Sequence, residues 1–241
     1  MSTYKTIGII IKRSNYGEAD RILTIFTEKL GKIRASAKGI RKIKSKLAGS
    51  LELFCLTDFV IAEGRNLDIV TGAEIRKCFF DLRNDLTKTQ KAFYLGELTE
   101  KLTEENDPHD EIFFLLDTVL ENINAEQSDI LISFFEFNLL TELGYHPELS
   151  ECIGCRSAIT ESDNTYFNYE HGGLICESCQ KGESPISNSA IKLLRLFLKH
   201  QISQVKKVTI DPKVLREVEN HTRKYLNQIS DKEFRSQRFL K

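Results

Sequence analysis

Four cysteines in the second half of the chain form two close pairs. Two residues separate Cys152 from Cys155 and likewise Cys176 from Cys179, and 20 residues lie between the pairs. Two intervening residues let both thiolates of one turn reach a single tetrahedral centre, and a second such turn completes a four-sulfur shell. The spacing therefore predicts one structural zinc ion held by Cys152, Cys155, Cys176 and Cys179, with no open position for catalysis.

Other uses of these sulfur atoms stay open at this point. The four cysteines also fit reduced structural thiols or two labile disulfides, and His171, which lies between the pairs, would serve as a ligand in place of one of them. The two remaining cysteines, Cys55 and Cys78, stand alone in the sequence and predict no disulfide framework. This pattern of cysteine usage favours a reducing compartment.

A run of basic residues is the second chemical signal. Eight Lys and Arg lie between positions 29 and 46 without one Asp or Glu, whereas residues 81–150 hold 4 basic and 16 acidic residues. This asymmetry is hidden in the whole-chain balance of 34 basic to 35 acidic residues. Such segregation is typical of a phosphate-binding part joined to a partner-binding or solvating part. We expect nucleic-acid contacts from Lys32, Arg34, Lys38, Arg41, Lys42, Lys44 and Lys46.

Short β-branched runs separated by turns must position these cations. The candidate strands cover residues 6–12, 21–27, 31–38, 54–63 and 67–71. Five short strands suit a small closed barrel better than an open sheet, and an oligonucleotide-binding (OB) barrel is the first candidate, with the five-stranded SH3-like barrel as its rival.

The loop at residues 39–50 is longer than a hairpin needs, which suggests a role on the surface; a merely solvated loop is the alternative. Tyr16, Phe26 and Phe54 could stack on bases. Aromatic side chains of a small barrel more often form its core, so we leave these three out of the predicted site.

Helical periodicity replaces the strand pattern after residue 75. Apolar residues recur at helical spacing over residues 79–102, 112–120 and 127–143, and further helices are expected from Ser187 or Ser189 and from Asp211 or Pro212. Between the cysteine pairs, residues 165–169 and 172–175 predict the hairpin of a zinc ribbon. The predicted fold is therefore α+β and multidomain. A barrel at residues 1–78 precedes a helical domain at 79–241 with a zinc ribbon inserted at 150–182.

Several signatures of catalysis are missing from the sequence. It has no GxxxxGK[ST] phosphate loop, no GxGxxG after a strand, no HExxH and no GxSxG. The five histidines are scattered, so we expect them at surface or capping positions. The sequence also has no apolar stretch of about 18 residues and no cleavage site near its N-terminus. We expect a non-catalytic protein that is soluble and not exported.

Seven short motifs follow one another along the chain. They are Gly8-Ile-Ile-Ile-Lys12, Tyr16-Gly-Glu-Ala-Asp20, Gly31-Lys-Ile-Arg34, Lys38-Gly-Ile-Arg41, Leu47-Ala-Gly-Ser-Leu-Glu-Leu-Phe54, Leu143-Gly-Tyr-His-Pro-Glu-Leu149 and Gly172-Gly-Leu-Ile-Cys176. Their order over roughly the whole length, with the charge layout and the missing phosphate loop, resembles the bacterial recombination mediator family RecO.

The resemblance implies an N-terminal OB barrel, a helical C-terminal domain and a zinc ribbon inserted in it. It also implies a role in DNA repair and homologous recombination through the RecF pathway. RecO-like proteins bind single- and double-stranded DNA, anneal complementary strands without nucleotide, and with RecR help RecA replace single-strand-binding protein on gapped DNA. Some members of the family lack the cysteines, so zinc would serve the fold and not the annealing.

Partners and location follow from the same resemblance. We expect DNA, RecR and the C-terminal tail of single-strand-binding protein as partners, RecA as an indirect one, no membrane, and a cytoplasmic, nucleoid-associated location. A second basic set on the helix after the ribbon includes Arg195 and Lys199, which we expect to contact the acidic tail; a solvated helix face is the alternative.

Two other classes of protein stay open. A zinc-ribbon RNA-binding or ribosome-associated protein would share the barrel and the basic run, and its relative affinity for single-stranded DNA and RNA would distinguish it. A metal-dependent nuclease acting through the acidic helices is the second class. Oligonucleotides that stay intact with magnesium or manganese would exclude it.

Overall fold

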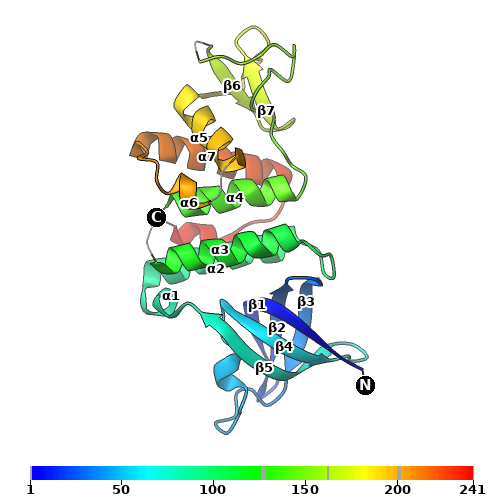
Figure 1. Cartoon of the computed structure of the whole chain (residues 1–241). Coiled ribbons are helices and arrows are strands. Elements are labelled where there is room, and N and C mark those ends of the chain that lie inside the picture. Colours follow the sequence, from blue (N-terminus) through cyan, green and yellow to red (C-terminus); the bar gives the residue numbers. More distant parts are fainter. Residues whose placement is uncertain (1, 126–128, 162, 200–201, 241) are drawn as a thin grey trace. The chain divides into compact units, whose positions relative to one another are not determined.

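The structure is a computed structural model that describes residues 2–125, 129–161, 163–199 and 202–240 (Figure 1). The chain packs as two compact units. The first comprises Met1–Gln127 and Phe234–Lys241, and the second comprises Ser128–Glu233. Each unit has its own sheet and its own helices.

Five strands of the first unit form a closed barrel. Around the barrel β1 neighbours β2, then β3, β5 and β4, and β4 returns to β1. Every pair is antiparallel except β3 with β5, which pair in parallel at Ala35–Asp68 and Ser36–Ile69. The five predicted strands are confirmed, and the first and last are longer than expected. The strands are β1 (Thr3–Tyr16), β2 (Asp20–Thr27), β3 (Gly31–Ala37), β4 (Cys55–Ala62) and β5 (Asp68–Cys78).

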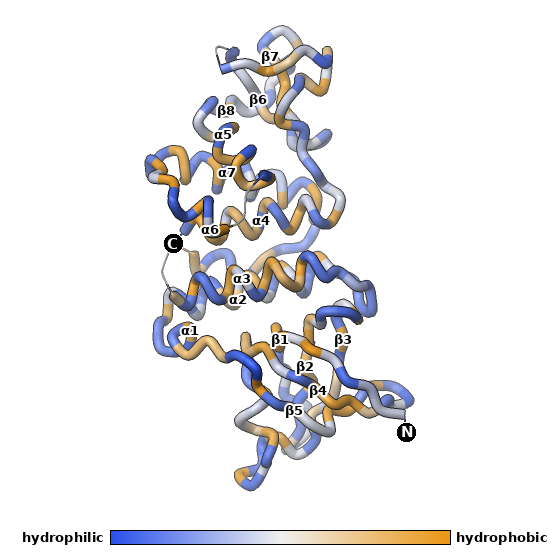
Figure 2. Tube along the Cα trace, viewed as in Figure 1, coloured by the Kyte–Doolittle hydropathy of each residue, from blue (hydrophilic) through white to orange (hydrophobic). Residues whose placement is uncertain are grey.

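Side-chain alternation along the strands fills the barrel. In β3, Ile33, Ala35 and Ala37 join the buried core, whereas Arg34 between them is exposed. Ile40 and Leu51, from the two ends of the segment that follows β3, enter the same core. Full burial of one such large aliphatic side chain stabilises the fold by about 1.5–3 kcal/mol. Figure 2 shows hydrophobic stretches along the barrel strands and hydrophilic turns between them.

Helices cover the outer face of part of this barrel. Phe26 of β2 and Phe113 of α3 lie in contact, with their ring centroids 6.5 Å apart. Asp85 is extended and accepts a hydrogen bond from the Lys88 amide, so it ends one helix and caps the next, a break that the sequence did not predict. The described helical elements of this unit are the 3₁₀ turn η1 (Ala48–Ser50), α1 (Phe80–Asn84), α2 (Leu86–Leu102), α3 (Asp110–Ala125) and the 3₁₀ turn η2 (Arg235–Phe239).

The C-terminal turn is fastened to α2 by one carboxylate. Glu97 accepts hydrogen bonds from the Ser236 amide and hydroxyl, from the Arg235 amide and from Lys101. Burial acts to raise the pKa of Glu97, but the hydrogen bonds outweigh this effect and lower the pKa to about 2. The C-terminal segment of the chain is thereby held against helix α2 of the first unit.

A buried lysine joins β3 to the end of α2. The side chain of Lys32 is 8% exposed, and its Nζ donates hydrogen bonds to the carbonyl oxygens of Glu100 and Thr103. The last carbonyl groups of a helix have no hydrogen-bond donor within the helix, and here the ammonium group is that donor. The Asn106 amide also donates to the Lys32 carbonyl, at 2.9 Å. The segment after α2 is thus bound along β3.

The second unit combines four helices with a small sheet. Phe197 of α5 packs against Phe134 and Phe137 of α4. In the sheet β6 lies between β7 and β8, and β8 was not predicted. The expected start of the third helix at Gln127 lies outside the described residues. The elements are α4 (Ile130–Glu142), β6 (Thr165–Asn168), β7 (Gly173–Cys176), β8 (Ser184–Ile186), α5 (Asn188–Lys199), α6 (Ile202–Val205) and α7 (Pro212–Ile229).

One histidine departs from its expected surface position. His221 of α7 is 4% exposed and lies between the Tyr169 hydroxyl, 2.8 Å from its Nδ1, and the Pro185 carbonyl, 3.1 Å from its Nε2. Burial lowers its pKa, which favours the neutral ring. The imidazole links helix α7 to the small sheet and is a structural residue.

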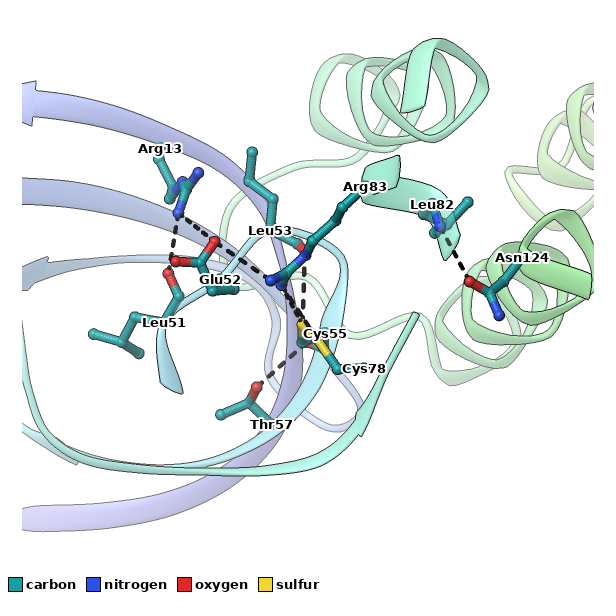
Figure 3. The surroundings of a disulfide bond; sticks show 10 residues. All are labelled: Arg13, Leu51, Glu52, Leu53, Cys55, Thr57, Cys78, Leu82, Arg83 and Asn124. Carbon is teal, nitrogen blue, oxygen red and sulfur yellow. Dashed lines mark hydrogen bonds and ion pairs between the residues drawn. A yellow bond between two sulfur atoms is a disulfide. The ribbon is translucent and has the colours of Figure 1, made fainter. Parts of the chain in front are cut away.

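Two cysteines that stand alone in the sequence are paired in the barrel. Cys55 begins β4 and Cys78 ends β5, where the antiparallel register sets them opposite each other with their Cα atoms 4.4 Å apart, and their sulfur atoms are bonded. The expectation of two isolated thiols was wrong because this register is a long-range property. Nη2 of Arg83 lies 2.8 Å from Sγ of Cys55 and 3.2 Å from Sγ of Cys78 (Figure 3).

The division into two units falls within the helical part of the chain. Helices α1 to α3 belong with the barrel, and α4 to α7 form the second unit with the small sheet. The domain boundary between residues 78 and 79 that the sequence suggests stays a prediction. Among the described residues, no helix is both long and apolar enough to cross a bilayer.

Gly31 lies at a close approach between the backbone of the barrel and that of the segment after α2. Its φ is +66°, and an added Cβ would lie 2.0 Å from the Asp107 carbonyl oxygen. Gly17 has a similar φ of +57° but no atom within 4 Å of such a Cβ. We expect Gly31→Ala to lower the free energy of unfolding by about 3 kcal/mol and Gly17→Ala by about 1 kcal/mol in urea titrations. Equal losses would contradict the close approach.

Candidate nucleic-acid interface and metal centre

The basic loop, residues 39–50, is held by hydrogen bonds that its backbone amides donate to the end of the β1–β2 turn and to the first residue of β2. The Gly39 amide donates to Oδ1 of Asp20 at 2.7 Å, and the Arg41 amide donates to the Ala19 carbonyl at 2.9 Å. Further turns within the loop and the 3₁₀ turn η1 (Ala48–Ser50) follow. In Figure 1 the loop leaves the barrel at the end away from α2 and α3. A long segment is thus fixed at the surface of the first unit.

The cations of this loop point into solvent. Among the described residues, no hydrogen bond or ion pair holds the ammonium groups of its lysines, and Arg41 donates to the Gly17 carbonyl at 3.2 Å while staying exposed. Their charges are therefore available to an anion. Five of the predicted cations are exposed in this way: Lys38, Arg41, Lys42, Lys44 and Lys46.

Two of the predicted cations lie in β3 and differ from those of the loop. Arg34 is half exposed and its Nε lies 3.9 Å from Glu105. Such an exposed pair contributes less than about 1 kcal/mol, so Arg34 remains accessible to another anion. Lys32 is buried and holds the carbonyl groups at the end of α2. Its assignment as a DNA contact is corrected to a structural role, because its outward position on β3 is covered by α2.

The three aromatic residues considered for stacking differ in exposure. Phe26 is buried against Phe113, and Phe54 is buried with its ring 5.3 Å from that of Phe93. Tyr16, at the end of β1, is 61% exposed and precedes Gly17, whose carbonyl accepts from Arg41. Tyr16 was not among the predicted site residues, because only the structure shows that its hairpin turn lies beside the basic loop.

The four cysteines of the two CxxC pairs come together in the second unit. Their sulfur atoms all lie within 4.8 Å of one another, and Sγ of Cys155 is 3.8 Å from Sγ of Cys176. The first pair is placed beside β7 because the Ile153 amide donates to the Leu174 carbonyl at 2.9 Å. Cys176 itself ends β7. The local CxxC spacing brings two sulfur atoms together, and the long-range contact with β7 brings the two pairs into one cluster of four.

The charges of this thiol cluster favour a bound cation. A hydrogen bond with Ser157 lowers the pKa of Cys155 to about 6, whereas hydrogen bonding to the neighbouring thiols, Cys176 first, raises the pKa of Cys179 to about 12. The first proton is easily lost, and each further negative charge in so small a space is opposed by the others. A soft divalent cation in the centre would remove this repulsion, and four thiolates are the donor set that suits zinc.

His171 does not join the sulfur cluster. It lies in the turn between β6 and β7, where its amide donates to Oδ1 of Asn168 at 2.8 Å. The group of potential metal ligands that the described residues bring together consists of the four cysteines alone. The alternative in which His171 replaces a cysteine is therefore wrong for this structure.

The two residues predicted to contact an acidic tail have different surroundings. Nε and Nη2 of Arg195 donate to the Leu149 carbonyl at 2.8 and 2.6 Å, which ties α5 to the segment before the first cysteine pair. Lys199 ends α5 and is exposed. The guanidinium of Arg195 thus has a structural task, and Lys199 is the freer of the two cations.

Comparisons with known proteins match the whole length of the fold just described. The family model "Recombination protein O N terminal" matches residues 1–79, and "Recombination protein O C terminal" matches residues 83–238. A DNA repair protein RecO of Dehalococcoides mccartyi is 38% identical over 95% of this chain and 92% of its own length. Those of Roseiflexus sp. and Acetivibrio thermocellus are 39% and 32% identical, over 98% and 100% of this chain and 84% and 97% of theirs. With both family models matched in order and relatives aligned from end to end, the chain belongs to the RecO family of DNA repair proteins.

Proposed function

We propose that this protein is a non-catalytic mediator of homologous recombination that binds single- and double-stranded DNA and anneals complementary strands without nucleotide. The observation that carries the proposal is the basic loop, which with the preceding Lys38 presents five exposed cations on a fixed backbone. Membership of a DNA repair family supports it. The protein would act on DNA in the cytoplasm, in association with the nucleoid.

The barrel supports the OB fold as its identity. An OB barrel is a five-stranded, partly open Greek-key barrel, and here the strand order 1-2-3-5-4 closes through a short parallel contact between β3 and β5. OB barrels use their strands and loops to bind single-stranded nucleic acids. The position of the basic loop directly after β3 agrees with such a use.

Annealing requires that two polyanions come close while their base edges stay free to pair. Lys and Arg side chains of the basic loop would neutralise phosphates and release counterions, so binding would be strong at low salt and largely independent of sequence. Arg34 would extend this surface along β3. Tyr16 would offer an exposed ring on which one base stacks, and this leaves hydrogen-bonding edges unoccupied.

The partners of the proposed function are RecR and the C-terminal tail of single-strand-binding protein, with RecA loaded as a consequence. Lys199 at the end of α5 supports a contact with an acidic tail, because it is an exposed cation on the helix that follows the zinc ribbon. Arg195 would help by fixing the segment that α5 packs on.

The four cysteines would hold one structural zinc ion. Cys152 and Cys155 would supply one half of the shell, and Cys176 and Cys179 the other half. The ion would neutralise the negative charge of the thiolates and would cross-link the two turns that carry the cysteines. With four sulfur ligands it would offer no open position to a substrate, so we assign it to the zinc ribbon as a fold element.

Removal of the four loop cations and of Lys38 tests the proposed function. We expect Lys38, Arg41, Lys42, Lys44 and Lys46, all changed to Ala, to flatten the plot of log affinity against log salt for single-stranded DNA. The slope should fall by up to about 3.5, which is 0.7 for each of five phosphate contacts. In a fluorescence assay, annealing of oligonucleotides coated with single-strand-binding protein should be lost together with the affinity.

A control variant that loses the same number of Lys and Arg elsewhere distinguishes the effect of the position of the cations from the effect of net charge. Lys181, Lys207, Lys213, Arg216 and Lys224 are exposed residues of the second unit, and their replacement by Ala removes the same four Lys and one Arg. This variant should anneal like the wild type. Wild-type protein that binds RNA in preference to DNA, or that cleaves the oligonucleotides with magnesium or manganese, would contradict the proposed function.

Loss of two thiolates tests the metal centre. Purified protein should release about one zinc ion per chain when its thiols are titrated with a mercurial reagent. The double variant Cys155→Ser/Cys179→Ser should contain no zinc and should lose several kcal/mol of stability in the second unit. The double variant Cys55→Ser/Cys78→Ser serves as the control, because it also removes two cysteines but should keep its zinc. A zinc-free wild type that unfolds normally would exclude the ribbon site.

A further inference from the structure

One apolar side chain stands out from the cations of the basic loop. Ile43, between Lys42 and Lys44, has a side-chain exposure of 105%, compared with 73% for Leu86 and 69% for Phe80, the next most exposed large apolar residues in the described part of the chain. Isoleucine is among the residue types that proteins most often bury. A single exposed apolar residue is ordinary on a protein surface, so its meaning depends on the residues around it.

The backbone on both sides of Ile43 is held in place. The Lys42 amide donates to the Gly39 carbonyl at 3.1 Å, and the Ser45 amide donates to the Lys42 carbonyl at 2.9 Å, so Ile43 lies within a hydrogen-bonded turn. Ile40 is buried in the barrel core, and Leu47 packs against that core. The loop is therefore anchored before and after its tip, and Ile43 is presented outward by a fixed support.

The surroundings of Ile43 indicate the chemistry of its partner. Exposed cations precede it at Arg41 and Lys42 and follow it at Lys44 and Lys46. A partner must combine closely spaced anions with an apolar surface between them, and nucleic acid does so because its bases lie between rows of phosphates. A lipid surface is less suitable, since binding to it needs the broad apolar face of an amphipathic helix, and Ile43 is one residue in a short turn.

We propose, on the basis of the DNA binding proposed above, that Ile43 is a wedge that inserts against a base and separates it from its neighbour in the stack. Apolar side chains inserted between base steps unstack them in other DNA-binding proteins. The cations on both sides would hold the phosphates of the step that Ile43 opens. A strand held with its bases apart would expose their edges to a complementary strand, so the wedge would assist annealing directly.

The wedge is tested with 2-aminopurine, whose fluorescence rises when it leaves the stack. Wild-type protein, added to saturation to single-stranded DNA that carries this base, should raise its fluorescence at least about twofold, and Ile43→Ser should remove the rise while weakening affinity only about fivefold, as for loss of one weak base contact. Ile43→Leu should keep the rise. Leu86→Ser, which removes another exposed apolar side chain of the same unit, should change nothing.

The alternatives give different results. Saturating binding by the wild type without a rise in fluorescence would overturn the wedge and leave the proposed DNA binding intact, whereas absence of DNA binding would overturn the proposed function itself. Binding to vesicles that contain anionic phospholipid tests whether Ile43 instead contacts lipid. If Ile43→Ser abolishes binding to vesicles but leaves the 2-aminopurine signal unchanged, the residue is a lipid contact and the wedge is wrong.

Discussion

The buried ammonium group of Lys32 is the interaction on which the first unit depends. A charged side chain is costly to bury unless it is fully hydrogen-bonded, and here the terminal carbonyls of α2 provide that environment. The pairing fixes β3 against the helix and the segment that follows it. From this junction β3 continues to Ala37, two residues before the basic loop begins.

Local patterns in the sequence account for the features that were predicted correctly. Alternation of apolar and polar residues locates the strands, and the CxxC spacing locates the thiol cluster, because both depend on neighbours a few residues away. Long-range register accounts for what was missed. Cys55 meets Cys78 only because β4 and β5 pair antiparallel, and Lys32 is buried only because the C-terminal end of α2 meets β3. No spacing in the sequence carries that information.

In the basic loop, the residues that stabilise the fold are different from the cations that would bind DNA. Ile40 and Leu51 belong to the core, and the amides of Gly39 and Arg41 make the contacts that fix the loop. The ammonium groups take no part in either task. In β3 the two roles meet on adjacent outward positions, since Lys32 supports the helix while Arg34 remains exposed. Charge alone therefore does not distinguish a binding residue from a structural one.

The main-chain anchoring of the loop has a consequence for how the family can evolve. A hydrogen bond from a peptide amide persists when its side chain is exchanged, so substitutions at Lys42, Lys44 or Lys46 leave the supports of the loop in place. Mutation and selection can then adjust affinity to the salt content of a new cell without a loss of folded protein. A strand position such as Ile33 has no such freedom, because each change of its side chain alters the packing of the core and lowers the stability of the fold. Substitution at these exposed loop positions therefore changes the charge offered to DNA with little effect on the stability of the fold.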